Sequence, residues 1–163
     1  MKRIGLLSDT HSHCDERYAH YFSQCDEIWH AGDFGSIGVA DALRSIAPLR
    51  GVYGNIDGME IRREFPEIQR FRCEGVEVMR KHIGGYAGHY DRSVVRELRM
   101  SPPQLFISGH SHIAKVMYDR QLNLLHINPG AAGLYGQQPV RTLMRFVIDG
   151  DRVKDLEVVE LGG

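Results

Sequence analysis

Residues with metal-binding side chains follow a series of apolar, strand-like runs in this chain. They are Asp9 and His11 after residues 2–8, Asp33 after 26–30, Asn55 after 49–53, His82 at the end of 76–82, and His110 and His112 after 104–108. Taken singly, each is most simply a turn, cap or surface residue. Together they offer carboxylates, imidazoles and one amide but no thiolate, a set that suits Mn, Fe, Zn or Ni better than a structural zinc site. Seven candidate ligands exceed the need of one tetrahedral ion, so we predict two ions that share a carboxylate.

The first third of the sequence predicts the elements that position these residues. Residues 2–8, 26–30 and 49–53 read as strands, separated by helices at 15–24 and 36–48. In the second helix Ser36 is a candidate cap, Val39, Leu43 and Ile46 form the apolar stripe, and Pro48 is a stop. A β-α-β-α-β order predicts parallel strands, and ligands bind beyond the carboxyl ends of such strands.

The remainder of the chain changes character. Three antiparallel hairpins are predicted at 68–73 with 76–82, 113–118 with 122–127, and 141–148 with 152–160; a helix is expected at about 91–100 and a buried strand at 104–108. We therefore expect an α/β fold in which two sheets pack as a β-sandwich flanked by helices. No linker or low-complexity segment interrupts the chain, so residues 1–163 form one predicted domain.

Composition excludes several classes of function. The chain has 163 residues, 42% of them hydrophobic and 25% charged, and its net charge is −1, which disfavours nucleic acid or an anionic membrane as a partner. No apolar run approaches the length of a membrane span. The three cysteines, Cys14, Cys25 and Cys73, form no Cys-x-x-Cys motif, so we expect a reducing, cytoplasmic location. The oligomeric state is left open, a homo-oligomer included.

The ordered set of motifs resembles the calcineurin-like metallophosphoesterases. The motifs read Asp9-Thr-His11, Gly32-Asp33, Gly54-Asn55, His82 and Gly109-His110-Ser111-His112. The resemblance is closest to the small, single-domain bacterial and archaeal phosphodiesterases of that superfamily, which carry an Asn-Pro-Gly element similar to "INPGAAG" at 127–133.

This resemblance implies a division of the ligands between two metal ions. Asp9, His11 and His112 would hold the first ion, Asn55, His82 and His110 the second, and Asp33 would bridge them. Manganese is the expected metal, with nickel, iron and zinc as alternatives. A hydroxide held between the ions would attack phosphorus in line, and the resemblance assigns catalysis to Asp33, Asn55 and His110. The implied substrate is a small-molecule phosphoester, most simply a diester.

The sequence departs from the family pattern at two places. Many members have Gly-Asn-His, whose His protonates the leaving oxygen, but this chain has Ile56 at that position. Ile56 therefore favours activated or diester substrates over demanding monoesters. The fourth motif is often His-Gly, whereas here it is His82-Ile-Gly-Gly. We assign His82 because it ends a strand, and His89 is the alternative.

Three further residues are candidates for contact with substrate. His13, Asp57 and His126 lie near the motifs in sequence, although His13 also suits a surface loop and Asp57 a turn or a partner of the ligands. His30 could orient a ligand or be a satisfied buried histidine.

Two other functions remain as alternatives to the phosphoesterase. A non-catalytic protein-interaction scaffold of the same fold is disfavoured because all seven expected ligands are present. A nuclease is disfavoured because no basic face is evident.

Overall fold

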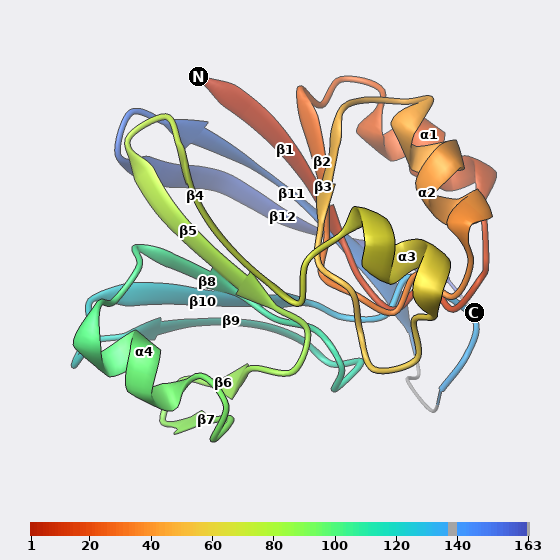
Figure 1. Cartoon of the computed structure of the whole chain (residues 1–163). Coiled ribbons are helices and arrows are strands. Elements are labelled where there is room, and N and C mark those ends of the chain that lie inside the picture. The colour runs from red at the N-terminus through yellow and green to blue at the C-terminus, as the bar shows by residue number, and fades with distance from the viewer. Residues whose placement is uncertain (137–139, 163) are drawn as a thin grey trace.

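The computed structural model describes residues 1–136 and 140–162, and its two five-stranded sheets pack face to face (Figure 1). The first sheet has the order β12-β11-β1-β2-β3, with bounds β1 (Lys2–Leu7), β2 (Glu27–His30), β3 (Leu49–Gly51), β11 (Arg141–Asp149) and β12 (Arg152–Gly162). The second has the order β4-β5-β8-β10-β9, with bounds β4 (Ile68–Cys73), β5 (Val76–Lys81), β8 (Leu105–Ile107), β9 (Ala114–Asp119) and β10 (Leu124–Pro129). The predicted two-sheet sandwich is confirmed.

Short helices lie on the outer sides of the sandwich. They are α1 (Glu16–Phe22), α2 (Ile37–Arg44), α3 (Met59–Glu64) and α4 (Val95–Met100), and a small hairpin of β6 (Gly85–Tyr86) and β7 (His89–Tyr90) accompanies α4. Helices α1 to α3 cover the first sheet, whereas α4 and the hairpin lie beside the second (Figure 1). No helix in the described ranges is long and apolar enough to cross a membrane.

The parallel strands β1, β2 and β3 end in register, as the β-α-β-α-β pattern predicts. Leu7 pairs with His30, and His30 pairs with Gly51. The residues that follow all three strands therefore emerge side by side at one edge of the sheet. This alignment is the reason that motifs separated by more than 20 residues reach the same place.

Alternation along these strands builds two apolar layers. Ile4, Leu6 and Trp29 face the second sheet, and Leu7 and Ile28 face the helices; all five are fully buried. On the outer side of the second sheet, Phe106 packs with residues of α4 in a third, smaller cluster. Each strand that leads to the site is thus fixed on both faces.

Several local expectations were wrong. Helix α2 ends at Arg44, well before Pro48, and Ser36 occupies the cap position without a side-chain cap hydrogen bond. The three predicted hairpins are present as β4–β5, β9–β10 and β11–β12, but the parallel pairing of β8 with both β5 and β10, which makes the second sheet mixed, was not expected. Helix α4 begins at Val95, and neither α3 nor the β6–β7 hairpin was expected.

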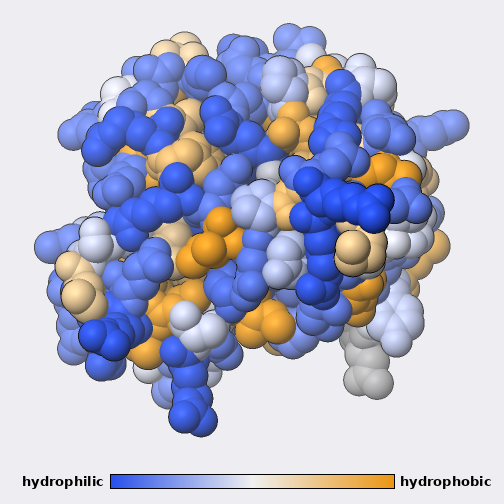
Figure 2. All heavy atoms as spheres, viewed as in Figure 1, coloured by the Kyte–Doolittle hydropathy of each residue, from blue (hydrophilic) through white to orange (hydrophobic). Residues whose placement is uncertain are grey.

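The surface seen from this side is mixed. Figure 2 shows apolar residues in small patches between hydrophilic ones, with no single apolar face in this view.

Candidate metal centre

The ligand-bearing loops adopt an uncommon backbone conformation. Asp9, His11, Asp33, His110 and His112 all have positive φ, between 45° and 73°. Non-glycine residues rarely adopt this region, although Asp and His tolerate it better than most. Such strain is kept only where the surroundings determine it. Backbone hydrogen bonds do so here: Asp9 donates to Gly32 O, and His11 donates to Asp33 O.

One group of possible ligands comprises Asp9, His11 and His112, whose ligand atoms lie within 4.8 Å of one another. His112 Nε2 is 3.2 Å from Asp9 Oδ1, and His11 Nε2 is 3.7 Å from the same oxygen. These are the three residues assigned to the first ion.

A second group comprises Asp33, His82 and His110, again with ligand atoms within 4.8 Å. His82 Nε2 lies 3.1 Å from Asp33 Oδ2, which is also 3.5 Å from His11 Nε2 of the first group. Asp33 therefore lies between the groups, where a bridging ligand would have to be. The amide oxygen of Asn55 is 3.1 Å from His110 Nδ1, so all seven predicted ligands are brought together.

The donor atoms fit metal ions well. Asp9 Oδ1, His11 Nε2 and His82 Nε2 are buried without a hydrogen-bond partner in residues 1–136 and 140–162. Ligands bonded at about 2.1 Å to one ion lie about 3–3.5 Å apart, close to the separations found here. His82 Nδ1 is 2.7 Å from Ala31 O, an acceptor, so Nδ1 carries the proton and Nε2 presents a lone pair to the site.

Each carboxylate is held by one oxygen and presents the other. Asp9 Oδ2 accepts from Ser8 Oγ at 2.6 Å and from the His110 amide at 3.1 Å. Asp33 Oδ1 accepts from the Ile56 amide at 3.1 Å. Oδ1 of Asp9 and Oδ2 of Asp33 then remain directed at the histidines.

Electrostatics favour the ionised form of Asp9. Burial alone raises the pKa of Asp9, but the nearby imidazoles of His11, His112 and His82 outweigh it and hold the pKa well below its usual range. Burial lowers the pKa of His82, yet Asp33 and Asp9 raise it by more. A proton on His82 and a metal cation would thus satisfy the same carboxylates, and metal binding must displace that proton.

Two motif glycines are required because side chains of other motifs approach their Cα atoms closely. A Cβ on Gly54 would lie 2.0 Å from Asp33 Oδ1. A Cβ on Gly32 would lie 2.5 Å from His82 Nδ1, and Gly32 also has a φ of +107°. The glycine of one motif thus makes room for the ligand of another, which explains the Gly-Asp and Gly-Asn pairs.

Buried His30 ties the first two loops together. The Gly32 amide donates to His30 Nδ1 at 3.0 Å, so Nε2 carries the proton and donates to Thr10 Oγ1, also at 3.0 Å. Thr10 Oγ1 in turn donates to Phe34 O. Burial lowers the pKa of His30 to about 3, which keeps the ring neutral. His30 is therefore a satisfied buried histidine that also positions the loops.

Asp57 performs a similar task for the second and third loops. It is 2% exposed, and its carboxylate accepts from the amides of Phe34, Gly35 and Gly54 at 2.8–3.2 Å. Both oxygens are occupied by backbone donors. The geometry favours a partner of the ligand loops over the contact with substrate that was also considered.

Asn128, in the "INPG" element, secures the loop of the histidine pair. Its amide donates to Gly109 O and Ser111 Oγ, and its Oδ1 accepts from the Gly130 amide. This side chain spans the β10 end and the loop after β8, so the Asn-Pro-Gly element positions His110 and His112.

The other candidates lie apart from the ligand groups. His13 contacts Asp15, with 3.7 Å between Nε2 and Oδ2, and exposed His89 packs against Tyr86 in the β6–β7 hairpin. His126 is fully buried and bonds to Ser108 Oγ at 2.8 Å. Substrate contact by His13 or His126 stays a prediction.

Sequence reasoning missed two residues at the site. Tyr135 stacks on the ring of His11, with centroids 4.9 Å apart, although it is 69% exposed. Ser8 orients Asp9 through its hydroxyl. Neither has a type or spacing that distinguishes it from an ordinary loop residue.

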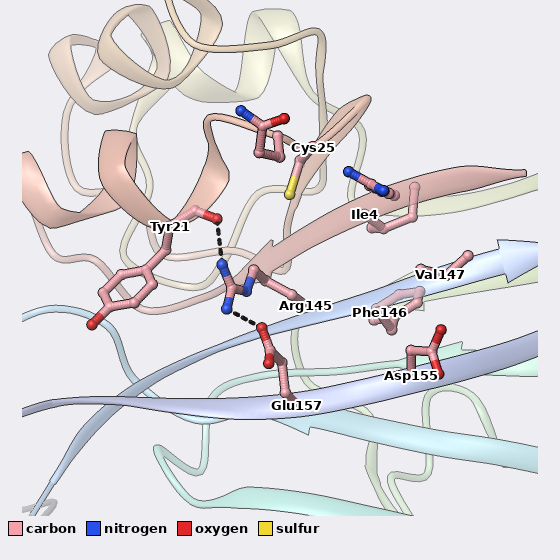
Figure 3. Close-up of a pocket in the computed structure, with 10 residues that line it drawn as sticks. Ile4, Tyr21, Cys25, Arg145, Phe146, Val147, Asp155 and Glu157 are labelled. Carbon is pink, nitrogen blue, oxygen red and sulfur yellow. Dashed lines mark hydrogen bonds and ion pairs between the residues drawn. The ribbon is translucent and has the colours of Figure 1, made fainter.

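A hollow elsewhere on the molecule has a volume of about 270 Å³ but contains none of the predicted site residues. It lies between α1, β1, β11 and β12, with Ile4, Tyr21 and Phe146 in its wall (Figure 3). Within it, Arg145 donates to Tyr21 O and pairs with Glu157, so its charge is already compensated. We therefore place the chemistry at the strand ends.

Comparisons with known proteins agree with this geometry. A profile of the calcineurin-like phosphoesterase superfamily domain matches residues 1–151. A probable metallophosphoesterase of Methanothermobacter thermautotrophicus is 31% identical over 170 residues, which covers 98% of this chain and 92% of the relative.

Solved structures share the fold. An archaeal phosphodiesterase superposes with a TM-score of 0.73 at 21% identity, covering 96% of this chain and 99% of that one. Vps29 of Entamoeba histolytica, solved in complex with zinc, superposes with a TM-score of 0.73 at 18% identity, covering 97% and 98%. At these identities the likeness shows the fold alone.

Replacing His82 and His89 separately tests which histidine belongs to the second group. We expect His82→Ala to lose one of two bound ions, whereas His89→Ala keeps both, because His82, unlike His89, directs a buried ring nitrogen at Asp33. Metal analysis after manganese loading, with circular dichroism to verify folding, measures this. The reverse pattern would transfer the assignment to His89.

Replacing Asp57 tests its role in holding the loops. Asp57→Ala leaves three backbone donors without their acceptor, so we expect a loss of about 3 kcal/mol in the free energy of unfolding. The melting temperature should fall by roughly 5–10 °C, and manganese affinity should fall with it.

Asp41→Ala is the matched control, since that carboxylate is 67% exposed on α2. Its melting temperature should equal that of the wild type. Wild-type melting and manganese binding by Asp57→Ala would exclude a positioning role for this side chain.

Proposed function

We propose a function from one premise: the chain belongs to the calcineurin-like phosphoesterase superfamily. The protein is a metal-dependent phosphoesterase, and its preferred substrates are phosphodiesters of small molecules. The observation that carries this proposal is the pair of ligand groups that meet at Asp33. Three of their buried atoms, Asp9 Oδ1, His11 Nε2 and His82 Nε2, have no hydrogen-bond partner in residues 1–136 and 140–162.

Two divalent ions bound there would lower the pKa of a water molecule and draw charge from the phosphoryl oxygens. The residues of the chain hold this arrangement in place. Asp33 lies between the groups, Asn55 and His110 stand at their solvent-exposed side, and the Ile56 amide fixes the Asp33 carboxylate. Catalysis is therefore assigned to Asp33, Asn55 and His110. No protein nucleophile is required.

Manganese is the proposed metal, with nickel, iron and zinc as alternatives, since nitrogen and oxygen ligands discriminate poorly among these ions. The three cysteines are free, which supports a reducing, cytoplasmic location. A scaffold role is less well supported, because the ligand set is complete.

Hydrolysis of bis-p-nitrophenyl phosphate by the manganese-loaded protein tests the proposal. The wild type should turn over this diester, and Asp33→Ala should fall to background because the carboxylate shared by both groups is lost. Asp41→Ala should retain full activity. Full metal-dependent turnover by Asp33→Ala would refute the bridged arrangement, and a metal-loaded wild type inert toward a panel of monoesters, diesters and cyclic nucleotides would favour the scaffold.

Ile56 provides a test of substrate preference. Its side chain is 46% exposed and offers no proton to a leaving oxygen. Ile56→His should raise phenyl phosphate turnover relative to that of bis-p-nitrophenyl phosphate by at least about tenfold, because a proton donor assists poor leaving groups most.

Ile56→Gln is the control, since glutamine is polar but is not an acid at neutral pH. An unchanged monoester-to-diester ratio in Ile56→His would remove the inference drawn from this position.

A further inference from the structure

A hollow of about 290 Å³ adjoins the second ligand group, and the proposed function does not yet use it. Its wall includes Gly109 and His110, so it begins at the loop that carries the histidine pair. It extends from there toward the β6–β7 hairpin and β9. We call it the Ile83 hollow. An ester whose phosphorus lies at the ligand groups would direct one of its organic groups into this space.

The side walls of the Ile83 hollow are apolar. Ile83 borders it on one side, and Ile113 and the ring of Tyr86 border it elsewhere. Ile113 directly follows the ligand His112 and is 62% exposed, while Tyr86 is 39% exposed. Burying exposed apolar side chains of this kind against an apolar ligand surface is favourable in free energy.

One uncompensated cation lies at the rim. Lys115 Nζ is 3.9 Å from the centroid of the Tyr86 ring, and it forms no ion pair within the described ranges. The carboxylate that also borders the hollow, Asp91, already accepts from the amide and hydroxyl of Ser93. With one cation and one carboxylate present, the hollow does not favour a second anion.

Buried His126 adds a second polar group. Its Nε2 bonds to Ser108, and its Nδ1 has no hydrogen-bond partner in residues 1–136 and 140–162. Burial and the charge of Lys115 lower the pKa of His126 to about 4, so the ring is neutral. An alkyl chain in the hollow would offer no acceptor to Lys115, whereas a flat ring with carbonyl oxygens could accept a hydrogen bond from it.

The space on the other side of Ile83 is different in kind. A second hollow of about 240 Å³ is bordered by Tyr53, Arg62, Glu67 and Lys81. Its cations are already engaged: Lys81 with Ser93 and Glu67, and Arg62 with the carbonyl of Asp57. The two sides of the second ligand group therefore offer one apolar and one polar environment, an asymmetry that suits a diester with unlike substituents.

We propose that the Ile83 hollow binds a flat, acceptor-bearing ring of the substrate, of the nucleobase type, with its faces against Ile83 and Ile113 and an acceptor atom toward Lys115. This proposal rests on the proposed phosphoesterase function and names its substrate class: small nucleotide esters rather than nucleic-acid polymers.

Three esters with the same p-nitrophenolate leaving group test the hollow. They are thymidine 5′-(p-nitrophenyl phosphate), phenyl p-nitrophenyl phosphate and methyl p-nitrophenyl phosphate. The leaving group is the same in all three, so ratios of kcat/KM report the other substituent. The wild type should prefer the thymidine ester, then the phenyl ester, then the methyl ester.

Two variants separate the apolar and polar contributions. Ile113→Ser should lower kcat/KM about tenfold for the thymidine and phenyl esters, because one apolar wall of the hollow is lost. The kcat/KM of the methyl ester should be unchanged. Lys115→Met keeps the aliphatic part of the side chain but removes its charge. It should lower kcat/KM about tenfold for the thymidine ester alone. Val116→Ser is the control, because Val116 is exposed on the opposite face of β9 and does not border the hollow.

A binding measurement independent of turnover completes the test. Saturation-transfer NMR on thymidine 5′-monophosphate with metal-free protein should show contact at the ring protons in the wild type and Val116→Ser, and weakened contact in Ile113→Ser. Equal kcat/KM for the thymidine and methyl esters, or ring contact unaffected by Ile113→Ser, would overturn the ring site while leaving the phosphoesterase intact. A wild type inert toward all three esters would overturn the proposed function and the ring site together.

Discussion

The structure depends on two carboxylates that lie buried side by side with imidazole rings. Asp9 is fully buried and Asp33 is 2% exposed, and each presents one oxygen to imidazole nitrogens rather than to water. An ionised carboxylate in such surroundings is costly unless cations or strong donors compensate it. Histidine protons can do this in part, but Asp9 Oδ1, His11 Nε2 and His82 Nε2 find no hydrogen-bond partner in the part of the chain that the structure describes. Divalent ions would satisfy all of these atoms at once, which is why these two groups are the candidate metal sites.

That requirement explains much of the local structure. Loops that bring several ligands to one point cannot use ordinary backbone conformations throughout, and five of the seven predicted ligands have positive φ. The strain is held by a surrounding set of neutral or backbone-bound groups, among them His30, Asp57 and Asn128. None of these three belongs to a ligand group. His30 and Asp57 each join two ligand-bearing loops, and Asn128 holds the loop of His110 and His112 against the end of β10.

Much of the site was predictable from the sequence, because its residues follow buried strands that end in register. Apolar runs predicted β1, β2 and β3, and the polar residues after them required no knowledge of packing. By contrast, α3 buries only Ile61 and spans six residues, too few for a helical period to emerge. The β6–β7 hairpin has two residues per strand. Parallel pairing of β8 on both sides depends on contacts between distant segments, which no local pattern encodes.

The role of Asp57 could not be decided from sequence for a related reason. An Asp after Gly-Asn-Ile is equally suited to a turn, a substrate contact or a partner of the ligands, and only the positions of the Phe34, Gly35 and Gly54 amides distinguish these. Ile56 illustrates the converse. Its amide holds Asp33 while its side chain is directed to solvent, so the backbone secures the metal ligands whatever the side chain is. Side-chain chemistry at this position can therefore vary without disturbing the geometry of the predicted ligands, and under the proposed function that variation would alter which leaving groups are accepted.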